Sequence, residues 1–304
     1  MKRSLLLAQI MSTPWALMPE TLNVMAGILR RWQAGESLPA ATHQRIEADQ
    51  SLRAARKAGT QAGSGQIAVL PLYGIITQRG NMVDALSGPG SCSTQQFAAA
   101  LSDALNDPAV EQILIDIDSP GGSVYGVEEL AAQILAARGQ KPVVAVANSL
   151  AASAAYWIGS AASEFYCTPG GEVGSIGVWQ AHEDLSDALK YEGIDVTLIS
   201  AGKFKVEGNP YEPLTAEATA FLQSRVDDYY NAFVAAVSQA RAVNTDEVIN
   251  GMGQGRVLGA SAALTLDMID GVMTFDQVVA MMQSRIKPPK ASRIAQAKQS
   301  LALM

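Results

Sequence analysis

Apolar positions divide the chain into a helical beginning, a polar stretch and a long region of alternating strands and helices. Residues 1 to about 38 carry apolar side chains at helical spacing, with Pro19 near the start of an amphipathic run. From residue 39 to 66 the composition turns to Ala, Gln, Arg and Gly, which is typical of a connector, with a short helix expected at 45–57. The pattern predicts three parts: a helical extension with its linker at 1–66, one large domain at 67–282 and a basic tail at 283–304.

Beyond residue 66 short apolar runs alternate with amphipathic ones. Strands are expected at 67–76, 112–117, 142–147 and 196–200, with short segments at 164–167 and 175–178. Helices are expected at 94–105 (with Thr94 as its cap), 127–137, 149–158, 185–192, 215–243, 246–250, 261–266 and 275–282. This alternation is the signature of a layered α/β fold with right-handed crossovers.

The charge and cysteine content exclude several classes of function. A net charge of -7 argues against a nucleic-acid binder, since only the tail beyond Met282 is locally basic. The apolar start is interrupted at Gln9, and no run reaches the roughly 18 apolar residues of a membrane span, so we expect a cytoplasmic protein that does not enter membranes. Cys92 and Cys167 stand in no metal-type spacing, and no metal or other cofactor is expected.

Three segments follow predicted strands, where ligands bind in open α/β sheets. The first contains Pro120, Gly121 and Gly122. Two glycines let the backbone approach a ligand and point N–H groups at it, as an oxyanion hole requires. The same residues are also compatible with an ordinary tight turn.

The second and third segments offer a nucleophile and a base. Ser153 lies among small residues a few positions past a strand, and the N–H of Ala154 is a further candidate oxyanion donor. Of the two histidines, His43 lies in the linker, so His182 is the only histidine candidate for a base. A lysine whose pKa is lowered by burial is the other option, and alternation along the chain cannot choose between Lys203 and Lys205.

Together these segments resemble the signal peptide peptidase A family of serine–lysine peptidases, which shares its fold with Clp protease and the crotonases. The resemblance covers about residues 67–280 and rests on five motifs in family order. They are Asp118-Ser-Pro-Gly-Gly-Ser123, the Ala-Ala-Ser-Ala-Ala-Tyr-Trp stretch at 151–157, Gly174-Ser-Ile-Gly-Val178, Gly202-Lys-Phe-Lys-Val-Glu-Gly-Asn-Pro210, and Gly255-Arg-Val-Leu-Gly259 with Asp270-Gly271. It implies a layered α/β fold of repeated ββα units with a helical N-terminal extension.

The resemblance also implies roles for single residues. Ser153 takes the place of the family nucleophile and Lys205 that of its general base, with Gly121, Gly122 and Ala154 as backbone oxyanion donors. Ser175 is a candidate for orienting the lysine. Because the surroundings of the serine are small, we expect small or apolar side chains before the cut. One departure is that Ala154 and Ala155 replace the glycines that often follow the nucleophile.

Residues 14–17, Pro-Trp-Ala-Leu, resemble the bacteriophage branch of this family, the protein C type of prohead protease. That branch implies maturation of the capsid inside the prohead, with scaffold and portal proteins as polypeptide substrates, and a homo-oligomer whose neighbouring subunits help build the active sites. The alternatives are a cellular signal-peptide-fragment peptidase without its membrane anchor, a non-catalytic capsid scaffold protein, and a crotonase-type hydratase or isomerase.

Overall fold

The computed structural model describes residues 13–33, 66–79 and 91–286; the expected helix at 45–57 lies outside them. The strands are β1 (Trp15–Leu17), β2 (Ile67–Tyr73), β3 (Ile75–Thr77), β4 (Ser91–Ser93), β5 (Gln112–Ser119), β6 (Gly121–Ser123), β7 (Val143–Ala152), β8 (Glu164–Cys167), β9 (Glu172–Gly174), β10 (Val257–Gly259) and β11 (Gly271–Val272). The helices are α2 (Pro19–Gln33), α5 (Thr94–Asn106), α6 (Val127–Ala137), α7 (Ala154–Ser160), α8 (Ser186–Tyr191), α9 (Ala216–Arg241), the π-helix η1 (Glu247–Gly251), α10 (Ala260–Thr265) and α11 (Phe275–Arg285).

The strands form two sheets. The larger contains the path β10-β9-β7-β5-β2, with β8 beside β7 and β11 beside β8, and its strands β2, β5 and β7 run parallel. Gln112 to Ile117 are all buried in β5, as expected of a parallel strand that is covered on both faces. The smaller sheet has the order β1-β6-β3-β4. The layered α/β fold predicted from the sequence is therefore confirmed.

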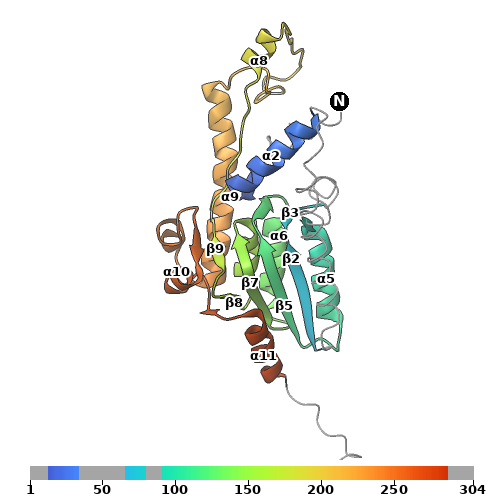
Figure 1. Cartoon of the computed structure of the whole chain (residues 1–304), viewed down its shortest axis with the longest axis vertical. Helices are drawn as coiled ribbons and strands as arrows, with labels where there is room; N and C mark the ends of the chain where they lie inside the picture. Colours follow the sequence, from blue (N-terminus) through green and yellow to red (C-terminus); the bar gives the residue numbers. More distant parts are fainter. Residues whose placement is uncertain (1–12, 34–65, 80–90, 287–304) are drawn as a thin grey trace, which may run out of the picture.

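Helices α5, α6, α7 and α9 enclose the main core on the larger sheet (Figure 1). Trp157 of α7 stacks on Phe233 of α9, with ring centroids 4.6 Å apart and planes 8° from parallel. Arg138, just after α6, donates hydrogen bonds to the carbonyl oxygens of Ala161 at the end of α7 and Ala240 near the end of α9. The helix that follows Ser153 is thus joined to α9 by packing and by a shared cation.

The structure corrects four local predictions. Residues 149–152 extend strand β7 instead of starting a helix, because Leu150 to Ala152 pair in parallel with β9. The cap of α5 is Ser93, whose hydroxyl accepts from the N–H of Gln96, and not Thr94. Residues 196–200 form no strand: their apolar side chains find no neighbouring strand and are largely exposed. Residues 15–17, predicted as helical, form β1.

Residues 186–221 form what we call the arm: α8, the segment that follows it, and the first turns of α9. Figure 1 shows α8 beyond the N-terminal end of α9, away from both sheets. Most of its large apolar side chains are exposed, including Tyr191 at 94% and Ile199 at 95%. Within the described ranges, none of the helices has both the length and the apolar character needed to cross a membrane.

Candidate active site at the end of strand β7

Ser153 occupies a sharp turn between β7 and α7. Its backbone has φ 56° and ψ -118°, a conformation that costs a non-glycine residue of the order of 1–3 kcal/mol and that is concentrated at functional sites. Its N–H donates to the carbonyl of Gly174 at 2.7 Å, and its hydroxyl donates weakly to that of Gly177 at 3.4 Å. A serine on a strained strand-to-helix turn is the arrangement of a nucleophile elbow. The sequence predicted the serine but placed it inside a helix.

The Pro-Gly-Gly turn lies against this serine. A side chain on Gly121, which has φ +99°, would meet the carbonyl oxygen of Ala152 and the Cβ of Ser153, each at 3.0 Å. One on Gly122 would lie 1.9 Å from the carbonyl oxygen of Ile76. Both positions therefore require glycine, and the turn packs beside the candidate nucleophile as the sequence predicted.

The candidate oxyanion amides differ in their hydrogen bonds. The N–H of Gly121 donates to the hydroxyl of Ser119 at 3.2 Å. The N–H of Ala154 belongs to the first turn of α7 and has no partner within the helix. Gly122 lies opposite Ala16 of β1. Gly121 and Ala154 lie next to Ser153, and the role of the three amides in holding an oxyanion stays a prediction.

Ser175 is brought to the same corner, although not to a lysine. It follows Gly174, whose carbonyl binds the N–H of Ser153, and its own N–H donates to the carbonyl of Arg256 at 2.8 Å. Ser175 is nearly buried and has φ 54°, again in the left-handed region. A second strained serine therefore lies next to the strained nucleophile turn.

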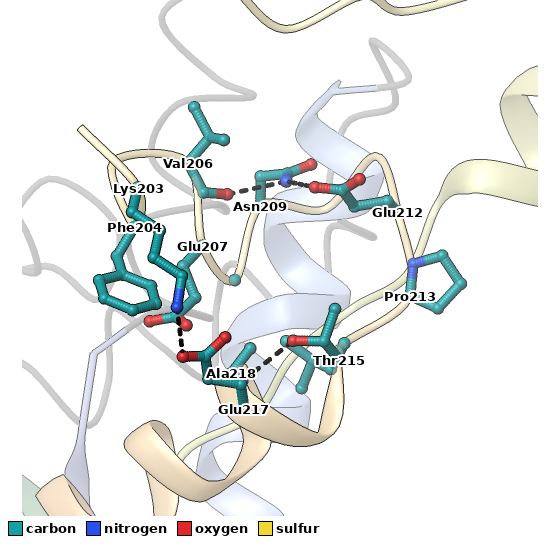
Figure 2. Close-up of a pocket in the computed structure, with 12 residues that line it drawn as sticks. Lys203, Phe204, Val206, Glu207, Asn209, Glu212, Pro213, Thr215, Glu217 and Ala218 are labelled. Atoms are coloured by element: carbon teal, nitrogen blue, oxygen red, sulfur yellow. Dashed lines mark hydrogen bonds and ion pairs between the residues drawn. The ribbon is translucent and has the colours of Figure 1, made fainter. Parts of the chain in front are cut away.

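Both lysines lie on the arm. Lys203 is held by Glu217, with Nζ and Oε1 2.8 Å apart, and its ammonium lies 4.4 Å from the ring centre of Phe204, at a pocket of about 190 Å³ that does not include Ser153 (Figure 2). Lys205 is exposed, and within the described ranges its ammonium has no hydrogen bond or ion pair. The protomer therefore does not bring Lys205 to Ser153.

Other reactive side chains are occupied or buried. The Nε2 atom of His182 lies 2.9 Å from the carbonyl oxygen of Asn209. Burial, reinforced by the charge of Glu172, raises the pKa of the Cys167 thiol to about 12, so this thiol stays protonated at neutral pH. Within the described part of the chain, no group of three or more His, Cys, Asp or Glu side chains is placed to hold a metal ion.

The sequence reasoning missed one element of the site, strand β1. Trp15, Ala16 and Leu17 are buried and pair with the glycine strand β6. A short apolar run between Pro14 and Pro19 was the available signal, because proline on both sides favours an extended segment over a helix.

Known proteins similar to this chain include two from bacteriophages and one from a bacterium. Capsid assembly protease C of Escherichia phage lambda is 33% identical over 225 residues, which is 74% of this chain and 50% of that protein. Head-tail preconnector protein GP5 of Enterobacteria phage P21 is 32% identical over 220 residues, 72% of this chain and 43% of that protein. Protease 4 of Salmonella typhi is 30% identical over 226 residues, 74% of this chain and 35% of that protein.

The chain spans half or less of the length of these relatives. The model of peptidase family S49 matches residues 136–287, half of the chain and a range that includes both Ser153 and Lys205. The resemblance seen in the sequence is therefore confirmed, and the chain belongs to peptidase family S49.

Proposed function

We propose that the protein is a serine endopeptidase in which Ser153 is the nucleophile and Lys205 the general base. The observation that carries the proposal is the turn at Ser153: a strained, buried serine between β7 and α7, packed against the two glycines of the Pro-Gly-Gly turn. Strain of this kind persists only where the surrounding structure enforces it.

The chemistry follows from these groups. The Ser153 hydroxyl attacks the carbonyl carbon of a peptide bond while Lys205 accepts its proton, and the negative oxygen is stabilised by backbone N–H groups at Gly121, Gly122 and Ala154. Lys205 then gives the proton to the leaving amine, which leaves an ester on Ser153. Water, deprotonated by the same lysine, hydrolyses the ester and restores the serine.

The environment of the two lysines favours Lys205 as the base. A base must be able to reach the serine, and the ammonium of Lys203 is already engaged by Glu217, with Nζ and Oε1 2.8 Å apart. Lys205 has no such partner within the described ranges. Its exposed position on the arm supplies no burial either, so the apolar surroundings of a neutral lysine must come from another subunit.

We therefore propose a homo-oligomer in which the arm of one subunit delivers Lys205 to Ser153 of its neighbour. The arm offers the kind of surface that subunit contacts bury, a set of exposed apolar side chains far from the core of its own protomer. These are Tyr191, Ile194, Val196, Leu198, Ile199, Phe204 and Tyr211.

Mixing inactive variants tests both the dyad and its assembly. Ser153→Ala and Lys205→Ala are each expected to lose at least about a thousandfold in kcat on a casein-type substrate, whereas Lys203→Ala, the matched control, stays active. After the two inactive variants are mixed and exchange subunits, part of the activity returns, because some sites combine an intact serine with an intact lysine. Equal activity in the wild type and all three variants would overturn the dyad. If the two inactive variants stay inactive after exchange, the shared site would be overturned.

Among biological roles, we propose maturation of a phage capsid inside the prohead, with scaffold and portal proteins as substrates. The support is the similarity to two phage proteins that bear the names capsid assembly protease and head-tail preconnector protein. The similarity to Protease 4 favours, as the second candidate, a cellular peptidase acting on signal-peptide fragments. Incubation with purified phage scaffold and portal proteins, against Ser153→Ala as control, separates the two: intact scaffold and portal would contradict the capsid role.

A further inference from the structure

Strand β1 lies between two extended segments beside Ser153. On one edge it pairs antiparallel with β6, with Trp15 opposite Ser123, Ala16 opposite Gly122 and Leu17 opposite Gly121. On its other edge Trp15 exchanges two backbone hydrogen bonds with Trp179, at 2.8 and 3.0 Å. We call the space between residues 121–123 and Trp179 the peptide groove, since peptidases bind their substrates as extended strands. In this structure the chain's own N-terminal segment fills it.

The register places one carbonyl of β1 at the candidate oxyanion corner. The N–H of Val124 donates to Pro14 at 3.3 Å, and the N–H of Met18 donates to Pro120 at 3.1 Å. Hydrogen-bonded pairs alternate along an antiparallel ladder, so Ala16 and Gly122, midway between these two, form the next hydrogen-bonded pair. The N–H of Gly122 therefore faces the carbonyl of Ala16.

Gly121 connects this carbonyl to the nucleophile. A side chain built on Gly121 would meet the Ala16 oxygen at 2.3 Å and the Ser153 Cβ at 3.0 Å. Strand β1 runs from the position opposite Ser123 to the position opposite Gly121, and therefore toward Ser153. Ala16 thus lies where the residue before the cut would lie, and it is small, as the surroundings of Ser153 require.

Several contacts hold β1 in place. The side chains of Trp15 and Leu17 are buried in a cluster with Leu22 and Met25 of α2 and Ile75 of β3. The indole N–H of Trp179 donates to the carbonyl of Leu17 at 2.8 Å, directly after the bond that would be cut. Helix α2 then begins at Pro19 and leads the chain out of the groove.

Both edges of β1 are occupied where it passes the serine, so a substrate cannot add outside it as a further strand. A peptide that reaches the Gly121–Gly122 corner must take the position of β1. The exposed fraction of Ser153, 1%, agrees with a groove that is already full.

We propose that the peptide groove binds extended peptides with a small residue opposite Gly122 and apolar residues on either side, and that β1 is a built-in competitor which a substrate displaces before it is cut. This inference rests on the proposed peptidase function. Because β1 is tethered, its effective concentration is high, and short peptides compete poorly until β1 is loosened.

A reversible lock tests the displacement. Trp15 and Ser123 form a non-hydrogen-bonded pair, where two cysteines are close enough for a disulfide, so Trp15→Cys/Ser123→Cys is built in a Cys92→Ser background. Oxidation is expected to lower kcat/KM on casein at least about tenfold and reduction to restore it, since a locked strand cannot be displaced. The Cys92→Ser protein alone, oxidised in the same way, is the control. Equal rates for the oxidised and reduced pair would overturn the competitor, whereas a Cys92→Ser protein no more active than Ser153→Ala would overturn the peptidase function itself.

A binding measurement needs no catalysis and tests the proposal even if the double-cysteine variant fails to fold. A capped peptide with the sequence of residues 13–18 is added to Ser153→Ala protein, and amide hydrogen exchange is followed by mass spectrometry. Exchange at residues 15–17 is expected to rise with peptide concentration. In a Trp179→Phe background, which lacks the hydrogen bond to the carbonyl of Leu17, it is expected to rise at lower peptide concentrations. Unchanged exchange at saturating peptide would overturn the proposal. The proposal would also be overturned if the wild-type protein yielded a fragment that begins at Leu17, because β1 would then be a substrate and not a competitor.

Discussion

The turn at Ser153 and the arm that carries Lys205 are built in opposite ways. Around Ser153, the stretch from Ala151 to Ser160 is buried within the same protomer. On the arm, residues 193–205 are exposed and contain no regular strand or helix. Half of the proposed dyad is thus fixed by the folding of one chain, whereas the other half lies on a surface whose apolar side chains still face solvent.

This difference separates stability from activity. Changes at the Ser153 end are expected to alter the free energy of unfolding of the protomer. Changes on the arm are expected to alter assembly and catalysis, with little effect on the protomer's stability. Three predictions test the contrast, in order of decreasing expected effect.

The first compares one phenylalanine from each region. Phe233→Ala removes a fully buried ring stacked on Trp157 and is expected to lower the free energy of unfolding by about 3–5 kcal/mol. Phe204→Ala, on the arm, removes a ring that is 52% exposed and is expected to change it by less than about 0.5 kcal/mol. Urea unfolding followed by circular dichroism, at concentrations where the protein is monomeric, measures both. Similar losses would mean that the arm packs as firmly as the core.

The second concerns the strain at Ser153. Ser153→Gly is expected to raise the free energy of unfolding by about 1 kcal/mol, because glycine adopts φ 56° without a steric penalty. Ser153→Ala, which keeps a Cβ at the same φ, is the matched control and brings no such gain, although both variants lack the nucleophile. The gain is read as a higher urea midpoint, and a glycine variant no more stable than the alanine variant would mean that the turn stores no strain.

The third is a pH effect on an ion pair at the end of the larger sheet. Arg285 donates two hydrogen bonds to Glu164 and, with Tyr166, holds the pKa of that carboxyl below its ordinary value of 4.5, although partial burial opposes this. A carboxyl whose pKa is lower in the folded than in the unfolded state stabilises the protein at pH values above the unfolded-state pKa. This stabilisation is lost as the pH falls through the folded-state pKa. Glu164→Gln is therefore expected to cost less than about 1 kcal/mol at pH 7, and nothing once the pH is well below 4.5.

Urea unfolding of both proteins at a series of pH values measures this difference. The arm provides the matched control: Lys203 and Glu217 are 70% and 60% exposed, so Glu217→Gln is expected to have no measurable effect at either pH. A Glu164→Gln penalty that persists at acid pH would contradict the assignment to the ion pair.

Prediction from the sequence succeeded where one chain determines its own surroundings. The strand predicted at 112–117, observed at 112–119, and the glycine turn follow from apolar runs and from the need for close backbone approach. It failed at residues 149–152, just before Ser153, where small residues fit a strand or a helix equally well and pairing with β9 decided the outcome. It also failed at residues 196–200, whose apolar side chains resemble a buried strand but have no neighbouring strand in the protomer. In the proposed assembly Lys205 reaches Ser153 from a second chain, and periodicity along one sequence cannot describe such a contact.

Helix α9 connects the arm to the helix that follows Ser153. Its 26 residues span about 39 Å at 1.5 Å per residue, from the arm at one end to the ring of Phe233 and the Arg138 cation toward the other. The Trp157 ring of the helix that follows Ser153 stacks on this Phe233 ring, and Arg138 donates hydrogen bonds to carbonyl oxygens of Ala161 and Ala240. One continuous helix therefore connects the arm to the packing behind the nucleophile turn.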